Sequence, residues 1–370
     1  MPRLVALVLL LLVTRVALGG EATWVLERRM VAGPNAGSPL FAASLAGGPA
    51  GVLAGVPAQS AGHAVLFDDA TGGVVTWLEA PVASREFGRA VAVTAHTLAV
   101  AAPDAGSVFL FDAQTGVVSQ TLRDPHAGGD AAEFGRALAL GPSDVVVGAP
   151  FDDHDGADAG AAWVFDRRRG TPRFALIPPI ARPGAHFGTA VAIAGDDVVV
   201  GASGEGASGT PGSVTLYSLR TGAVRWSRSA PPSTAGRLFG FAVAAGGRHV
   251  AVGAPCRDGG SSAGLVVVLE RATGKPLYEL TAPAPEQCDF FGGAVALGAG
   301  TIVVGARLAG DPDTGAVHVF AASTGRPLAS FGGGGAAARL GWSVATRGSR
   351  VLAGAAGADG DVRVYRRARD

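Results

Sequence analysis

The sequence predicts an all-β fold, a seven-bladed β-propeller with four antiparallel strands in each blade. Two observations lead to this prediction. One phrase recurs seven times, and the spacing of roughly 50 residues leaves room for four short strands in each interval. The phrase is an aromatic residue and a glycine, a short apolar segment, and a valine run ending in Gly-Ala-Pro or a variant. The clearest copies begin with a Phe-Gly pair near residues 87, 134, 187, 239 and 291. A weaker copy begins at Leu340-Gly341, near residue 340, and a degenerate one at Phe41-Ala42, near residue 41.

The copy that begins at Phe134 illustrates the four strands of one blade. Its second strand is a run of β-branched residues, which indicates a buried strand, and Pro150 ends that strand because proline cannot donate to a sheet ladder. Turn residues separate the other segments, and Gly170 lies in the turn before the last strand. The predicted strands of this unit are residues 137–140, 144–148, 161–165 and 173–177.

The two ends of the repeat array predict how the ring closes. The last copy stops after its third strand, at Tyr365, so its fourth strand is missing. Residues 23–29 form a spare strand ahead of the first copy. We expect this strand to pair in the last blade, because the pairing closes the ring and leaves no bare edge there.

Composition narrows the function classes. The chain has 30 basic and 30 acidic residues, whereas proteins that bind nucleic acid or membrane surfaces normally carry a basic excess. We therefore expect neither partner. The hydrophobic fraction of 48% with only 16% charged residues argues against disorder. The 57 glycines follow no collagen-like period, so they indicate many turns.

The first residues have the pattern of an export signal. Arg3 precedes the apolar run 4–13, and the small residues Ala17 and Gly19 suit a signal peptidase. We expect residues 1–19 to be a signal peptide and 20–370 to form a single propeller domain. The mature protein is then secreted, periplasmic or at the cell surface, with no membrane insertion after cleavage. The alternative is an uncleaved N-terminal anchor.

The repeated phrase resembles the FG-GAP repeat family, whose best known members are the integrin α-subunit propellers. Phe134-Gly135 with Gly148-Ala149-Pro150 carries the resemblance, and so does Phe239-Gly240 with Gly253-Ala254-Pro255. The pattern is most similar to the secreted bacterial members. The resemblance implies a propeller that binds a partner in an adhesion-like role. Integrin-type blades often bind calcium between their first two strands, but the turns at that place here lack the necessary carboxylates.

One loop concentrates acidic residues. Asp152, Asp153, Asp155 and Asp158 fall within seven residues, which favours either a calcium site or a solvated, turn-rich loop. Calcium is the one cofactor that the sequence suggests. A thinner acidic pair, Asp311 and Asp313, occupies the corresponding loop of a later blade.

The two cysteines are expected to form a disulfide. Loops that join the second and third strands of a blade lie on the same face as the loops between blades. Cys256 is in a loop of the first kind and Cys288 is in a loop of the second kind.

The same face carries the longest polar loops, and binding residues commonly lie on loops held by a rigid scaffold. We expect a protein or glycan partner to dock there near the axis, on a propeller that is a monomer. The seven histidines form no zinc motif, and the sequence has no catalytic elbow, Walker loop or dinucleotide fingerprint, so we expect no enzyme activity. The alternatives are a quinone-dehydrogenase-like propeller enzyme and a structural surface protein without a discrete ligand. The binding-face candidates are Arg182, His186, Arg237, Arg257, Asp258, Asp311 and Asp313.

Overall fold

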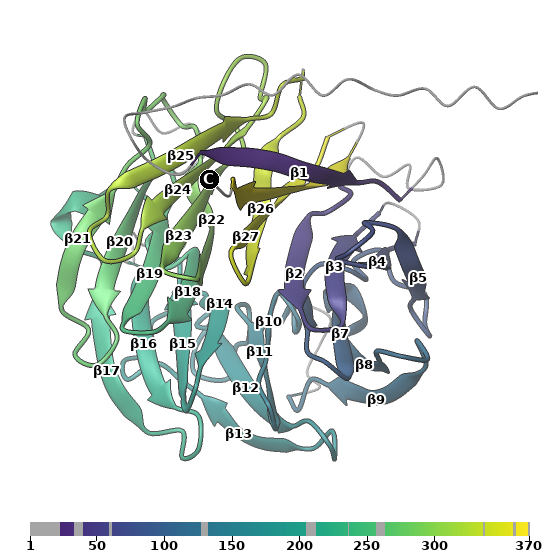
Figure 1. The fold of residues 1–370 in the computed structure, drawn as a ribbon. Helices are drawn as coiled ribbons and strands as arrows, with labels where there is room; N and C mark the ends of the chain where they lie inside the picture. Colours follow the sequence, from purple (N-terminus) through teal and green to yellow (C-terminus); the bar gives the residue numbers. More distant parts are fainter. Residues whose placement is uncertain are drawn as a thin grey trace, which may run out of the picture.

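The computed structural model shows a ring of seven antiparallel four-stranded sheets (Figure 1). It describes residues 23–32, 40–58, 61–126, 132–204, 212–235, 237–256, 263–335, 337–357 and 360–368. Within these residues the only helical segments are two short 3₁₀ turns, η2 (Pro103–Ala105) and η3 (Pro232–Thr234). The predicted all-β propeller with seven blades is therefore confirmed.

Each of the first six blades follows the chain order from the axis outward. Blade one contains β2 (Ser44–Gly48), β3 (Gly51–Val56), β4 (His63–Phe67) and β5 (Val74–Glu79); blade two contains β6 (Val91–Val93), β7 (Thr97–Ala102), β8 (Ser107–Asp112) and β9 (Val118–Arg123); blade three contains β10 (Ala137–Leu140), β11 (Asp144–Ala149), β12 (Ala161–Asp166) and β13 (Pro172–Leu176). Blade four contains β14 (Phe187–Ala194), β15 (Asp197–Ala202), β16 (Ser213–Ser218) and β17 (Val224–Ser229); blade five contains β18 (Ala242–Gly246), β19 (His249–Ala254), β20 (Leu265–Glu270) and β21 (Pro276–Leu280); blade six contains β22 (Phe291–Gly298), β23 (Thr301–Ala306), β24 (Ala316–Ala321) and β25 (Pro327–Gly332).

Blade seven is built from both ends of the chain. It contains β26 (Leu340–Arg347), β27 (Arg350–Ala355), β28 (Asp361–Arg367) and, as its outer strand, β1 (Trp24–Met30). Strand β1 runs antiparallel to β28, with Trp24 opposite Arg367 and Met30 opposite Val362. The predicted ring-closing strand is confirmed, displaced by one residue from the expected range.

A charged cluster holds the closing strand against blade one. The Arg350 guanidinium donates to both Glu27 carboxylate oxygens, at 2.7 and 3.0 Å, and to Asp69 of blade one at 3.1 Å. Arg28 also donates to the Asp69 backbone carbonyl at 2.8 Å. The Glu27 carboxylate is only 14% exposed, and its hydrogen bond to Arg350 lowers its pKa. This cluster links the closing strand, blade seven and blade one.

A tight turn repeats in all seven blades, and its two central residues are the aromatic-glycine pair in blades two to six, Phe41-Ala42 in blade one and Leu340-Gly341 in blade seven. The backbone N–H after the pair donates to the carbonyl of the residue before it, for example from Arg136 to Glu133 at 2.9 Å and from Trp342 to Arg339 at 3.2 Å. The glycine is the third residue of the turn and has a φ of 103° at Gly135, a value that type II turns reserve for glycine. The aromatic side chain is fully buried between blades, as at Phe134.

The glycine of the Gly-Ala-Pro segment has a different role, which is close contact with the next blade. A Cβ on Gly253 of blade five would lie 2.0 Å from the carbonyl oxygen of Gly292, which is the turn glycine of blade six. The same contact recurs at most blade junctions. Blade two has Ala101 at this position, and there the opposing Gly135 lies against the alanine side chain instead. The two halves of the repeated phrase therefore contact each other across blade boundaries.

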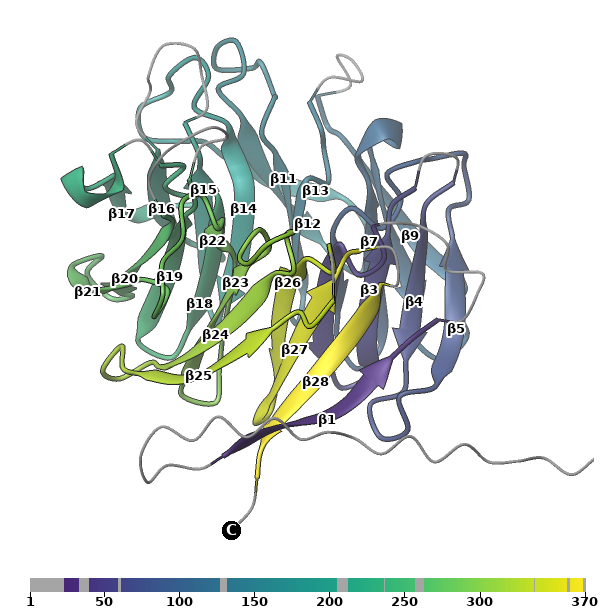
Figure 2. The same cartoon turned by 90° about the horizontal axis from the view of Figure 1, so that it is seen from above.

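The inner strands surround the axis, and the loops separate onto two faces. The first strands of adjacent blades contact one another around the ring. Figure 2 shows the loops between second and third strands, together with those between blades, at one end of the molecule, which we call the long-loop face. The other end carries hairpin turns such as the one at Gly116, whose φ of 69° is in the left-handed region that favours glycine. We call it the short-turn face.

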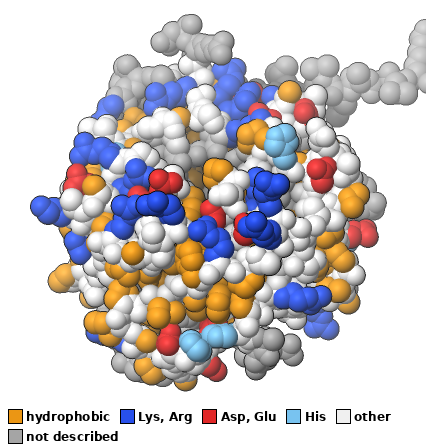
Figure 3. Space-filling view, turned by 90° about the horizontal axis from the view of Figure 1, so that it is seen from below, with side chains coloured by type: hydrophobic (Ala, Val, Ile, Leu, Met, Phe, Trp, Pro, Cys, Tyr) orange, Lys and Arg blue, Asp and Glu red, His pale blue; other side chains and the backbone are white. Residues whose placement is uncertain are grey.

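The outer wall of the ring has a mixed surface. Figure 3 views the side that faces downward in Figure 1, where β13 lies, and shows basic side chains above hydrophobic ones. Arg168 and Arg169 belong to an exposed turn, in which their backbone N–H groups donate to Asp166. Both arginine side chains are exposed to solvent.

Candidate functional site

The seven tight turns place a ring of side chains at the long-loop end of the inner strands. Each turn contributes the residue before the aromatic-glycine pair and the residue after it, and we call this ring the axial rim. Its composition changes around the axis, because the flanking residues differ between blades although the turn does not. From blade one to blade seven the pairs are Leu40 and Ala43, Glu86 and Arg89, Glu133 and Arg136, His186 and Thr189, Leu238 and Phe241, Phe290 and Gly293, and Arg339 and Trp342.

One arc of the axial rim is charged. Blades two and three carry the same Glu-Phe-Gly-Arg turn, and Arg136 donates to Glu133 at 2.6 Å. Partial burial raises the pKa of Glu86, with the neighbouring Glu133 adding to the effect. Burial also lowers the pKa of Arg89, to which the nearby Arg136 contributes. Two glutamates and two arginines thus interact around the mouth of the ring.

The opposite arc, on blades five to seven, is aromatic and cationic. The Arg307 guanidinium lies over the Phe290 ring, 3.4 Å from its centroid, and 4.8 Å from the centroid of Trp342. Phe241 meets Phe290 edge to face, with centroids 5.5 Å apart. Arg339 also lies over the Trp342 ring, 5.8 Å from its centroid. We call these five residues the arginine-aromatic arc.

His186 lies between the two arcs but is not exposed. The side chain is 8% exposed and its ring is 4.8 Å from that of Phe151. The residue occupies the left-handed backbone region with a φ of 52°. This predicted binding-face residue is therefore placed at the rim mainly as packing for the loop that follows β11.

A second cluster lies on the same face where blades two and three meet. The His126 and His154 rings are 4.2 Å apart, and His126 Nδ1 is 3.4 Å from the Asp152 carboxylate. The Trp163 indole meets His126 at right angles, 5.1 Å away, and its buried N–H has no hydrogen-bond partner. Burial raises the pKa of the neighbouring Asp124. This cluster joins an inter-blade loop to the acidic loop.

The acidic loop uses its carboxylates within its own backbone turns. Asp152 is 4% exposed and accepts the His154 N–H at 2.9 Å, and Asp153 accepts the Asp158 N–H at 2.7 Å. Across the described ranges, no group of three or more His, Cys, Asp or Glu side chains is gathered so that it could hold a metal ion. As arranged, Asp152, Asp153, Asp155 and Asp158 do not form a calcium shell. The calcium site and the turn-rich loop stay the two predictions for these residues, and the hydrogen bonds within the loop favour the second.

Part of the chain matches a known repeat family. A model of the FG-GAP repeat family matches residues 125–165, 175–217 and 278–320, which include the repeated phrases of blades three, four and six. These three segments are similar to FG-GAP repeats. No curated protein matches the chain. The other four blades contain the same tight turn and the same four-stranded sheet. In the described part of the chain, no helix has the length and hydrophobicity needed to cross a membrane.

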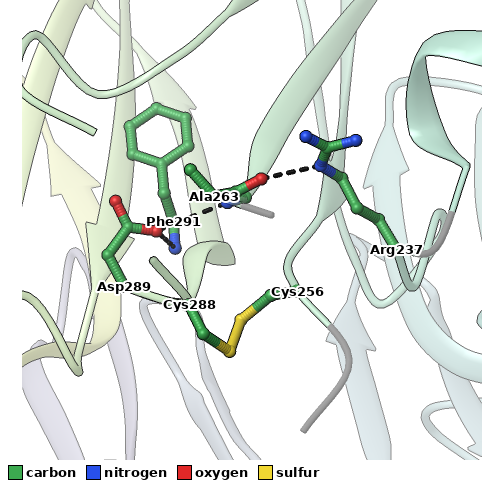
Figure 4. Close-up of a disulfide and its surroundings, with 7 residues drawn as sticks. Arg237, Cys256, Ala263, Cys288, Asp289 and Phe291 are labelled. Atoms are coloured by element: carbon green, nitrogen blue, oxygen red, sulfur yellow. Dashed lines mark hydrogen bonds between the residues drawn. A yellow bond between two sulfur atoms is a disulfide. The ribbon is translucent and has the colours of Figure 1, made fainter. Parts of the chain in front are cut away.

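The predicted disulfide is present in the ring. Cys256 follows β19 and Cys288 precedes β22, and the two are joined across a separation of 32 residues (Figure 4). Nearby, the Asp289 carboxylate is 1% exposed and accepts the Phe291 N–H at 2.9 Å. Arg237 donates to the Ala263 carbonyl at 2.7 Å. The disulfide thus joins the residue after β19 to the entry to blade six, and the Arg237 hydrogen bond ties Ala263 to the segment before β18.

The remaining binding-face candidates differ in their placement. Arg182 is exposed on an inter-blade loop, whereas Arg237 uses its guanidinium to hold the loop that follows Cys256. Asp311 is exposed, and Asp313 is half-buried with a left-handed φ of 45°. Arg257 and Asp258 lie outside the described residues, as do the predicted signal peptide and the long loop 205–211.

Of the axial rim residues, only His186 was among the predicted site residues. The signal of the rim in the sequence is the identity of the residues flanking each aromatic-glycine pair, notably the Glu-Phe-Gly-Arg repeat at Glu86 and Glu133. A second signal is Arg307, which stands where the motif has proline. Both become functional candidates once the closed ring brings residues about 50 positions apart to one mouth.

Proposed function

We propose that this FG-GAP propeller is an exported binding module that docks a protein partner at the axial rim of its long-loop face. The observation that carries the proposal is the arginine-aromatic arc, where Arg307, Phe290 and Trp342 from two blades stack at the mouth of the ring. Tryptophan and arginine are the residue types most enriched at protein-binding hot spots.

The scaffold supports this role in two ways. The seven-bladed ring presents its loops from a rigid frame, the usual setting for a binding surface. The disulfide fixes one of these loops beside the rim, and such bonds persist in oxidising compartments outside the cytoplasm. An adhesion-like role follows if the protein stays at the cell surface.

Site-specific photo-crosslinking tests the proposal in the cells that export the protein. A benzophenone amino acid replaces Phe241 on the rim in one variant and Val117, which is 64% exposed on the short-turn face, in the matched control. We expect a defined protein adduct from the rim position only. Equal adducts from both positions, or none from the rim, would contradict the proposal, and an adduct that periodate destroys would point to a glycan.

A further inference from the structure

The arginine-aromatic arc presents guanidinium edges rather than aromatic faces. Arg307 lies between Phe290 and Trp342, at 3.4 and 4.8 Å from their centroids, and Arg339 lies over Trp342 at 5.8 Å. Stacking on a ring leaves the N–H groups at the edge of a guanidinium able to donate in its plane. On Phe290 and Trp342, a sugar ring or a cation from a partner would have to compete with these guanidiniums for the aromatic faces.

Arg339 supplies hydrogen-bonding capacity that the described part of the protein leaves unused. Its Nε is buried without a hydrogen-bond partner, and no carboxylate of the described residues forms an ion pair with its guanidinium. A buried donor without a partner has a free-energy cost of about 1–3 kcal/mol, which an incoming acceptor removes. Arg339 also occupies the left-handed backbone region, with a φ of 51°.

The surroundings of these donors select among anions. Phe241, Phe290 and Gly293 offer no side-chain hydrogen-bonding groups, and Phe290 is only 3% exposed. The hydroxyl groups of an acidic sugar would lose water here without gaining partners. A carboxylate on an aliphatic stem suits the site, because its two oxygens match the planar guanidinium fork and its methylenes can contact the aromatic rings.

We infer that the arginine-aromatic arc is a carboxylate-recognition site that takes a glutamate or aspartate side chain from an acidic segment of a protein partner. The inference rests on the proposed function of the axial rim and adds the chemistry of the partner. Charge complementarity identifies the occupant, since the arc carries two cationic side chains and the described residues set no carboxylate against Arg339.

The test uses a capped peptide with consecutive glutamates and a matched peptide with glutamines, titrated calorimetrically into the mature, oxidised protein at low salt. We expect binding of the glutamate peptide alone. Arg339→Gln should weaken it by about tenfold or more, the range for losing a charge-assisted hydrogen bond, while Arg339→Lys restores part of the affinity. Thermal melts of both variants confirm that they fold.

Arg182→Gln is the matched control, because it removes one exposed positive charge from the same face without touching the arc. Equal loss of affinity in this control would show diffuse attraction and overturn the inference. Equal binding of both peptides, no peptide binding, or tighter binding of a glucuronate oligosaccharide would also overturn it. If rim crosslinks to a protein partner persist in any of these cases, the proposed function stands and only the carboxylate assignment fails.

Discussion

Replacing Gly253 with alanine tests the packing between blades. The added Cβ would lie 2.0 Å from the Gly292 carbonyl oxygen, roughly 1.4 Å closer than an ordinary van der Waals contact. That carbonyl belongs to a tight turn whose next residue, Gly293, donates to Phe290 at 3.0 Å, so it cannot rotate away cheaply. Blades five and six must therefore separate. We expect a loss of about 2–3 kcal/mol in the free energy of unfolding, the upper range for overpacking a core.

The matched control is Gly332→Ala, where nothing lies within 4 Å of the added Cβ. This substitution reduces the backbone freedom of the unfolded chain, so it should leave the free energy of unfolding unchanged or raise it by a few tenths of a kcal/mol. Guanidinium denaturation of the two oxidised variants, followed by tryptophan fluorescence, compares their midpoints at equal slope. If Gly253→Ala is as stable as Gly332→Ala, close backbone contact is not the reason for the glycine.

The remaining predictions concern charge, the disulfide and calcium. Glu27→Gln should lower the free energy of unfolding by about 1 kcal/mol near pH 7. The folded-state pKa of Glu27 is depressed, so the carboxylate stabilises the fold above its ordinary pKa, and this stabilisation is lost as the pH falls through the folded-state pKa. The stabilities of variant and parent should therefore converge in acid denaturation curves. Burial lowers the pKa of His318 to about 4, so between pH 6.5 and about 4 this histidine is protonated in the unfolded chain but not in the folded chain. The parent protein should therefore lose up to about 3 kcal/mol of its free energy of unfolding as the pH falls over that range, and His318→Gln should abolish this loss. An unchanged pH dependence of stability in the variant would refute this. Replacing Cys256 and Cys288 together with serine should cost about 3 kcal/mol in urea titrations, and equal stability with and without reductant in the parent would contradict it. For the loop 152–158 we expect the same melting temperature with calcium and with chelator; a clear rise with calcium would assign a metal to the loop, because a ligand of the folded state alone stabilises it.

Strand order and ring closure were predictable because they follow from short-range pattern and repeat count. The valine run at 144–148 and the missing last strand after Tyr365 each specify a pairing without knowledge of neighbouring blades. The residue preference of a tight turn is also local, which is why the turn at Gly170, whose φ is 67°, could be predicted.

Contacts between blades were less accessible from the sequence. The aromatic-glycine pair was visible in the sequence as a repeat, but neither the burial of Phe134 between blades nor the positive φ of Gly135 could be read from it. His126 and His154 come from different loops, so a search for closely spaced histidines could not find their stacked pair. Likewise, nothing near Arg307 in the sequence indicates that Trp342 will lie over it. Such contacts depend on the rotation between sheets, which no local pattern specifies.

The way the ring closes determines how the protein can carry a mechanical load. Trp24, at the start of β1, is opposite Arg367, at the end of β28, and the Ala368 N–H donates to the Thr23 carbonyl at 2.6 Å. A force that pulls the two ends apart therefore acts at one end of an antiparallel pair and breaks its hydrogen bonds one at a time rather than together. Both strand ends point toward the short-turn face. If the protein is attached through only one end of the chain, no force acts across the β1–β28 pair. The long-loop face then points away from the point of attachment.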